Sequence, residues 1–144
     1  MIVNHLDYEI DDSLSRIDFD RVYAWLASTY WWEYGLTREK TERGARYSSL
    51  VIGVYHQGEQ VAFCRVVSDR IRFAWLADVF VAPAHRQKGL ARAIVRFALD
   101  HSDYADVRRW LLANRDAHPL YAALGFVSLA NLENMMELRR TLAR

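Results

Sequence analysis

The sequence of 144 residues contains one cysteine, two prolines and six glycines, and it has no long hydrophobic run. Cys64 has no second cysteine to pair with, and its place in the apolar run 61–67 indicates a buried small hydrophobe in a reducing compartment. No proline- or glycine-rich linker interrupts the chain, so we expect a single domain over 1–144. The longest apolar stretch, 73–84, is short and contains Asp78, which argues against a membrane span.

The charges are also nearly balanced, with 19 basic and 18 acidic residues and a net charge of +1. Binding to a nucleic-acid backbone needs a large basic excess, so nucleic acid is not an expected partner. The first residues lack the basic-then-apolar pattern of a secretory signal, and we expect a cytoplasmic protein. A homodimer is a reasonable expectation for a small domain in which 13% of residues are aromatic.

A short basic segment, HRQKGLA at 85–91, is the most informative part of the chain. It follows a strand-like run at 75–81 and opens a helix-like run at 90–99. The first amides of a helix have no intrahelical partner, and the helix dipole places partial positive charge there. Gly89 allows close approach of the backbone to a phosphate, and Arg86 and Lys88 add full charges. The segment therefore predicts a pyrophosphate-binding turn, although it is neither the mononucleotide loop nor the dinucleotide fingerprint.

A second motif follows about thirty residues later. Residues 109–113 are typical of a buried strand, and Asn114 comes directly after them. A short turn and a helix-like segment follow, ending in Tyr121-Ala-Ala-Leu-Gly-Phe126. Taken alone, this segment predicts only a strand and a helix that ends at a glycine.

Together the two motifs are much more specific. Arg86, Gly89 and Ala91 match the pattern Arg/Gln-x-x-Gly-x-Gly/Ala, and Asn114 precedes Tyr121 by seven residues. In this order and separation they resemble the signatures of the GNAT superfamily of acyl-CoA-dependent N-acyltransferases. The resemblance covers roughly residues 51–126.

The expected elements follow the order of the GNAT fold. This is an α+β fold with a mixed sheet, an antiparallel meander followed by a parallel, splayed strand pair, flanked by helices. The elements are a first strand before Asp11, a helix capped by Asp18, a helix at 37–46, strands at 50–55, 60–67 and 71–81, a helix at 90–99, a parallel strand at 109–113, and two final strands around 126–128 and 134–138.

The resemblance implies acetyl-CoA as co-substrate, with no metal. The residues that it assigns to the CoA moiety are Val79, Phe80 and Val81 through their backbone, then Arg86, Gln87, Lys88, Gly89, Leu90, Ala91, Arg92 and Asn114. Arg92 is a candidate contact to the 3′-phosphate, whereas Arg96, one turn further, is expected to lie on a solvated face. Asn114 either bonds the pantetheine or caps the end of its strand.

Tyr121 and Asp78 are the principal candidates for proton transfer. Tyr121 resembles the general acid of the family, and its alternative role is packing against the sheet. Asp78 lies inside an apolar strand, where an unpaired carboxylate is costly, so it is either the general base or the partner of a buried cation. Many members carry a glutamate one position earlier, where this chain has Ala77. His118 is a further candidate, although a histidine beside a proline is more often a turn residue.

The aromatic segment Tyr30-Trp31-Trp32-Glu33 lies where the family builds its acceptor pocket. Such a wall suits an amine, including through cation–π contact, while core packing and a dimer interface are the alternatives. The sequence predicts direct acetyl transfer to a small-molecule or peptide amine in a ternary complex. The rival interpretations are a non-catalytic acyl-CoA-binding module and an interaction domain without a CoA site.

Overall fold

The computed structural model describes residues 1–29 and 35–140. The chain divides into two compact units, Met1–Ala113 and Asn114–Arg144. The first unit holds a six-stranded sheet in the order β1-β2-β3-β4-β5-β6. Its strands are β1 (Ile2–His5), β2 (Tyr8–Asp11), β3 (Leu50–His56), β4 (Glu59–Ser68), β5 (Ala74–Val81) and β6 (Trp110–Leu111). Neighbours from β1 to β5 are antiparallel, and β6 is parallel to β5, which confirms the expected mixed sheet.

The antiparallel meander is confirmed, with one local difference at the start of β5. The turn between β3 and β4 is formed by Gln57 and Gly58, both with positive φ (52° and 83°), as a two-residue hairpin requires. Strand β5 begins at Ala74 rather than at residue 71. Asp69 Oδ1 accepts hydrogen bonds from the backbone N–H groups of residues 71, 72 and 73, and these bonds hold the three residues in a turn.

The N-terminal segment is a hairpin where the sequence predicts a single strand. Strands β1 and β2 pair from Ile2↔Asp11 to His5↔Tyr8, and the tight turn between them requires a positive φ of 54° at Leu6. Leucine is an unusual residue for this conformation, so the turn leaves no recognisable signal in the sequence.

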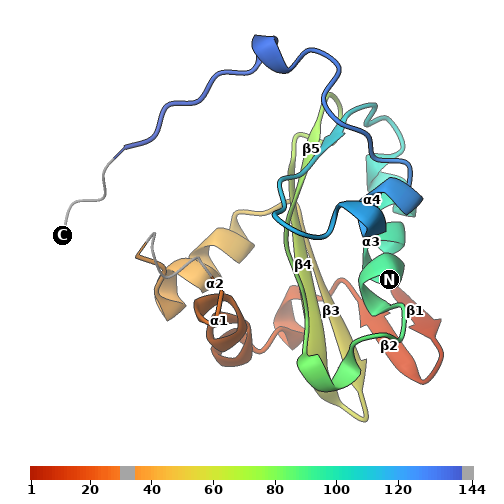
Figure 1. Cartoon of the computed structure of the whole chain (residues 1–144). Helices are drawn as coiled ribbons and strands as arrows, with labels where there is room; N and C mark the ends of the chain where they lie inside the picture. Colours follow the sequence, from red (N-terminus) through yellow and green to blue (C-terminus); the bar gives the residue numbers. More distant parts are fainter. Residues whose placement is uncertain (30–34, 141–144) are drawn as a thin grey trace. The chain divides into compact units, whose positions relative to one another are not determined.

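Two helices cover one face of the sheet (Figure 1). The helix α1 (Phe19–Ala27) is capped as predicted, since Asp18 Oδ1 accepts from Arg21 N at 3.1 Å. The helix α2 (Arg38–Arg46) is capped by Thr37, whose Oγ1 accepts from Lys40 N at 3.1 Å. Their apolar faces pack on β3 and β4 in one core cluster made of Ile17, Phe19, Val22, Leu26, Ala45, Val51 and Phe63.

The helix α3 (Leu90–Asp100) lies on the opposite face of the sheet and carries the chain to β6 (Figure 1). Its buried side chains are Leu90, Ile94, Val95, Phe97 and Ala98. The parallel pairing with β5 is short, because it joins only Ala74 to Trp110 and Trp75 to Leu111. Beyond Trp75, no described strand pairs with this edge of β5, which agrees with the splayed pair that the fold predicts.

The second unit contains the helix α4 (His118–Ala123) and the 3₁₀ turn η5 (Leu132–Asn134). The two final strands expected around 126–128 and 134–138 do not form, and this prediction was wrong for the described residues. The only regular element assigned among residues 126–140 is the turn η5. The apolar side chains that suggested strands are largely exposed, with Val127 at 87% and Met136 at 96%.

Candidate functional site

A β-bulge interrupts the pairing of β4 with β5 at Asp78. Phe63 pairs with Phe80 and Arg65 with Ala77, so two residues of β5 lie opposite the single residue Cys64. Asp78 adopts a positive φ of 58°, a conformation that aspartate tolerates better than most residues. The extra residue shifts the side-chain alternation of β5 and bends the strand just before the segment predicted to bind pantetheine.

The Asp78 carboxylate is paired with a partly buried arginine. Its Oδ2 accepts a hydrogen bond from Arg65 Nε at 2.6 Å, and only 9% of the Asp78 side chain is exposed. Arg65 also donates from Nη1 to Ser48 Oγ at 3.2 Å. The ion pair removes the cost of burying an isolated carboxylate, so the structure supports the second interpretation of Asp78 and leaves its role as a base untested.

A cavity of about 170 Å³ opens beside this ion pair, between the helical face and the sheet. It is lined by Leu26, Leu36, Lys40, Thr41, Gly44, Phe63, Arg65 and Asp78. The predicted aromatic wall of Tyr30, Trp31 and Trp32 lies outside the described residues. The cavity places a carboxylate and two cationic side chains next to an apolar wall, which is an arrangement suited to a small polar ligand.

The strand segment Val79–Phe80–Val81 borders the same region. Phe80 stacks on Trp25 of α1, with ring centroids 5.4 Å apart and an interplanar angle of 17°. The β6 side of this segment has no strand partner among the described residues, so backbone groups there remain open to a ligand. This geometry suits an extended, amide-containing arm such as pantetheine, which binds by strand-like hydrogen bonds.

The basic turn at 85–89 joins β5 to α3 through the 3₁₀ turn η3 (Pro83–His85). Arg86 Nε donates to Val81 O at 3.0 Å, and its guanidinium lies 5.5 Å from the centroid of the Phe80 ring. Gln87 and Gly89 both have positive φ, 62° and 75°. Gly89 is the N-cap of α3 and no side chain caps the helix, so its first amides are available to an anion.

The turn is held in place by the β1–β2 hairpin. His5 Nε2 lies 3.0 Å from Lys88 O, and Tyr8 Oη lies 2.9 Å from His85 Nδ1. A methyl group added at Gly89 would lie 3.5 Å from the His5 ring, so the hairpin also limits the space beside the glycine. These observations fit a pyrophosphate group at the start of α3, in contact with Lys88 and the open amides.

Two further arginines, Arg92 and Arg96, follow along α3. Arg96 Nη1 lies 4.0 Å from Asp100 Oδ1 on an exposed face, in agreement with a solvated arginine. Arg92 and Arg96 both border a cavity of about 590 Å³, together with His5 and Gly89. Arg92 is the nearer of the two to the turn in the chain and stays a candidate contact for a phosphate.

The remaining predicted residues belong to the second unit. Asn114 Oδ1 accepts from Ala117 N at 2.8 Å, so this side chain stabilises the turn that precedes α4. Tyr121 lies on α4 and packs edge-on against Phe126, with ring centroids 5.8 Å apart. His118 is the first residue of α4 and Pro119 the second, which agrees with a helix-initiating role for this pair.

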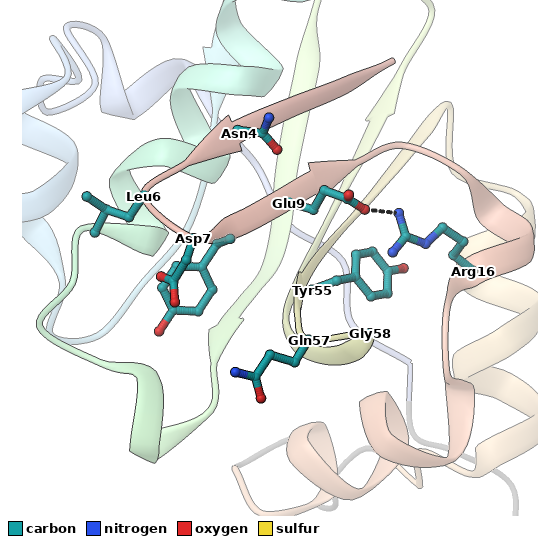
Figure 2. A pocket seen from close by; sticks show the side chains of 9 residues that line it. Asn4, Leu6, Asp7, Glu9, Arg16, Tyr55, Gln57 and Gly58 are labelled. Atoms are coloured by element: carbon teal, nitrogen blue, oxygen red, sulfur yellow. Dashed lines mark hydrogen bonds and ion pairs between the residues drawn. The ribbon is translucent and has the colours of Figure 1, made fainter.

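Another cavity, of about 370 Å³, lies between the β1–β2 hairpin and the β3–β4 turn (Figure 2). Arg16 lines this cavity, and the Nη1 of its guanidinium group donates to Glu9 Oε1 at 2.6 Å and to Asp11 Oδ2 at 2.8 Å. The same group lies 3.8 Å from the centroid of the Tyr55 ring. We therefore assign Arg16 a structural role, the neutralisation of the buried Asp11.

The most important residue missed in the sequence is Arg65. It lies within the apolar run 61–67, and a charged residue in such a run is the same signal that drew attention to Asp78. The contacts of His5 with Lys88 and of Tyr8 with His85 left no signal in the sequence, because the partners lie far apart in the chain, separated by 83 and 77 positions.

The described residues contain neither a metal-binding group nor a membrane-spanning helix. No group of three or more histidine, cysteine, aspartate or glutamate side chains is arranged to hold a metal within residues 1–29 and 35–140. In the same part of the chain, no helix has both the length and the apolar character that crossing a bilayer requires.

The comparisons with known proteins agree with this geometry. The model of the Acetyltransferase (GNAT) family matches residues 13–126. A solved structure from Xanthomonas campestris pv. campestris, assigned to the GNAT acetyltransferase family, is 33% identical, with a TM-score of 0.87, and the match covers 96% of this chain and 95% of that one. No curated protein matches the sequence.

More distant structures share the fold. An acetyltransferase structure from Deinococcus radiodurans R1 is 22% identical with a TM-score of 0.69, covering 97% of this chain and 94% of that one. Glucosamine-6-phosphate N-acetyltransferase from Arabidopsis thaliana is 16% identical with a TM-score of 0.66, covering 94% and 99%. The fold and the family match thus define an acyltransferase. The chain belongs to the GNAT acetyltransferase family, whose members generally use acetyl-CoA as co-substrate.

Proposed function

We propose that this protein transfers the acetyl group of acetyl-CoA directly to the amine of a small-molecule or peptide acceptor within a ternary complex. The observation that carries the proposal is the arrangement along β5. The strand places the Asp78 carboxylate on a cavity at its bulge, and it then leads through an unpaired edge into the basic turn before α3. Membership of the family supports acyl transfer in general.

The chemistry sets the tasks of the site. The neutral amine nitrogen attacks the thioester carbonyl carbon, a C–N bond forms and the C–S bond breaks. An acceptor that arrives as an ammonium ion loses two protons overall. One proton leaves with a base before attack, and the other replaces the bond to sulfur when CoA departs as a thiol.

We assign these tasks as follows. Asp78 takes the first proton, directly or through a water molecule, and Tyr121 donates a hydrogen bond or a proton to the departing sulfur. The backbone of residues 79–81 holds the pantetheine arm. Residues 86–91 hold the pyrophosphate, assisted by Arg92, and Asn114 shapes the turn before the helix of Tyr121. Tyr30, Trp31 and Trp32 contribute to the acceptor side.

Direct transfer is favoured over a covalent acyl-enzyme. Cys64 is fully buried in β4, and burial, the largest cause, raises the pKa of its thiol far above the usual range. A buried thiol of this kind is a poor nucleophile, because the reactive form is the thiolate.

We further propose that both compact units belong to one acetyltransferase domain, in a cytoplasmic protein that forms a homodimer. The family match supports the first of these points, since it runs from residue 13 to residue 126 and crosses the boundary at Ala113.

The test is release of free CoA from acetyl-CoA in the presence of a panel of amines, combined with calorimetric measurement of CoA binding. We expect saturable CoA release that depends on an amine. Tight CoA binding without turnover on any amine would favour a non-catalytic acyl-CoA-binding module. Failure of millimolar CoA to raise the Tm would favour an interaction domain, because a ligand at 100 times its Kd stabilises a protein by about 2.7 kcal/mol.

A further inference from the structure

Gly44 is an unusual residue for its position, the seventh of nine in α2. A glycine inside a helix destabilises it relative to alanine, so such a glycine normally serves a positive φ or a close contact. Neither applies here. The φ of Gly44 is not in the left-handed region, and a methyl group added to it would meet no atom of residues 1–29 or 35–140 within 4 Å. The space beside residue 44 is open.

That open space belongs to the cavity beside the Asp78–Arg65 ion pair. Lys40 and Gly44 lie one helical turn apart and both line the cavity. Across from them are the ion pair and the apolar side chains of Leu26 and Phe63. A side chain at position 44 would therefore take up volume in the cavity without displacing the packed core.

The volume limits the size of an occupant. The cavity measures about 170 Å³, and a cavity of about 150 Å³ in another protein holds one benzene ring. It is thus large enough for the amine-bearing part of a compact molecule.

The charges limit the chemistry of the occupant. Asp78 and Arg65 neutralise each other at 2.6 Å, which leaves the positive charge of Lys40. Among the described residues no carboxylate lies within ion-pair distance of Lys40, whose Nζ reaches only Gly35 O at 3.5 Å. A polyamine would bring several further positive charges to this wall. An acceptor with an anionic group would place its ammonium at Asp78 and its anion near Lys40.

We infer that the acceptor is a compact amine that also carries a carboxylate, a free amino acid in chemical class, and that Gly44 determines how large its side chain can be. This inference rests on the proposed acetyl transfer. Gly44 and Lys40 act on specificity and take no part in the proton transfers.

The first experiment compares acceptors in matched pairs: alanine with ethylamine, leucine with isoamylamine, and both with putrescine and spermidine. Each kcat/KM is calculated from the concentration of neutral amine, so that differences in the pKa of the acceptors do not affect the comparison. We expect the amino acid of each pair to have a kcat/KM about 5- to 10-fold above that of its partner, as one charge at short range in a hydrated site provides. The substitution Lys40→Gln should remove this preference. Arg43→Gln, on the same helix but away from the cavity wall, should preserve it.

The second experiment fills the cavity. Gly44→Ala should raise the Tm by about 2–4 °C, because alanine is the better helix former. Gly44→Val should lower kcat/KM for leucine by 10-fold or more, with a smaller effect for alanine, since one methylene in a pocket changes such ratios by about 10- to 200-fold. The raised Tm of Gly44→Ala separates filling of the cavity from loss of the fold.

The outcomes separate a failure of the amino-acid class from a failure of acetyl transfer itself. Preferential acetylation of polyamines or bare amines would overturn the amino-acid class while upholding acetyl transfer. A folded Gly44→Val variant with unchanged kcat/KM for leucine would overturn the role of Gly44. If no amine is acetylated, acetyl transfer itself fails, and saturation-transfer NMR of leucine with the CoA-loaded protein then decides on the cavity. Absence of binding to the wild-type chain in that measurement would overturn the inference.

Discussion

Arg65 of β4 and Asp78 of β5 form an ion pair at the bulge in the pairing of these two strands, with Arg65 Nε 2.6 Å from Asp78 Oδ2. Each charge lies in a sequence run that is otherwise apolar, and each makes the burial of the other tolerable. The pair also lines the proposed acceptor cavity. One interaction therefore stabilises the bulge and brings a carboxylate to a place where an amine can reach it.

Asp78→Asn is expected to lower kcat by about 100-fold at neutral pH, the low end of the range for a general base. The loss should shrink as the pH approaches the pKa of the acceptor amine, because the amine then arrives without its extra proton. Profiles of kcat against pH for both proteins check this expectation. A loss of equal size at every pH, or an unfolded variant, would show that Asp78 is structural. Urea unfolding of the Asp78→Asn variant is the control, because it shows whether loss of the ion pair with Arg65 alone destabilises the fold.

Replacing both Arg86 and Lys88 by alanine should weaken CoA binding by about 2–4 kcal/mol, since one charge-assisted bond contributes about 1.5–3 kcal/mol and the two overlap. Calorimetric titration with CoA measures the change. Arg86 also donates to Val81 O, so the single variant Lys88→Ala tests the phosphate contact without loosening the end of β5. Arg96→Ala, on the exposed face of α3, should bind CoA as the wild type does. An unchanged affinity in the double variant would remove the phosphate assignment.

Tyr121→Phe should lower kcat by about 10- to 1,000-fold with nearly unchanged CoA affinity. An ordinary thiol has a pKa near 8.5 and an ordinary tyrosine one near 10, so full proton transfer is uphill by roughly 2 kcal/mol. A hydrogen bond that strengthens as charge develops on sulfur is sufficient. Thioesters of more acidic thiols should therefore show a smaller loss, measurable with single-turnover kinetics. Wild-type turnover in the variant, with acyl transfer limiting the rate, would mean that Tyr121 only packs on Phe126.

The buried Asp11 predicts how stability depends on pH. Burial raises the pKa of its carboxyl, but the hydrogen bonds from Arg16 and Ser13 lower it by more, so the net pKa lies below the ordinary value. Such a group stabilises the fold at pH values above about 4, and this contribution is lost as the pH falls through the lowered pKa.

Arg16→Met removes the partner of Asp11 and should lower the free energy of unfolding at pH 7 by about 3 kcal/mol, the low end for one member of a buried pair. The guanidinium is partly exposed, which is why the low end applies. Urea unfolding between pH 2 and pH 7 measures both the loss and its pH dependence. Arg38→Met, which breaks surface ion pairs with Asp20 and Glu42, should cost less than 1 kcal/mol. Equal losses in the two variants would contradict the special role of Asp11.

The sequence predicts those parts of the fold that depend on local signals. The cap at Asp18, the hairpin turn at Gln57 and Gly58, and the turn before α3 each follow from a few adjacent residues. For the same reason the pyrophosphate turn is predicted from residues 85–91 alone, since its glycine, its two cations and the helix that follows are neighbours in the chain.

Features that depend on distant contacts could not be predicted. The bulge at Asp78 shifts the pairing of β5 by one residue, and nothing in the alternation of its apolar residues marks the shift. The pairing of Arg65 with Asp78 could not be predicted, because it depends on how β4 and β5 align. The apolar residues after Phe126 suggest strands, yet strand formation requires a neighbour that local sequence does not specify.

The contacts of His5 and Tyr8 with the turn at 85–89 have a consequence for how the cofactor is bound. A loop that must become ordered around a ligand loses affinity to the entropy of that ordering. Here the β1–β2 hairpin orders the loop during folding, so the binding step starts from a pre-organised receptor. If CoA binds at this turn as proposed, its affinity is thermodynamically coupled to the stability of the β1–β2 hairpin, and fraying of the first eleven residues would speed the dissociation of CoA.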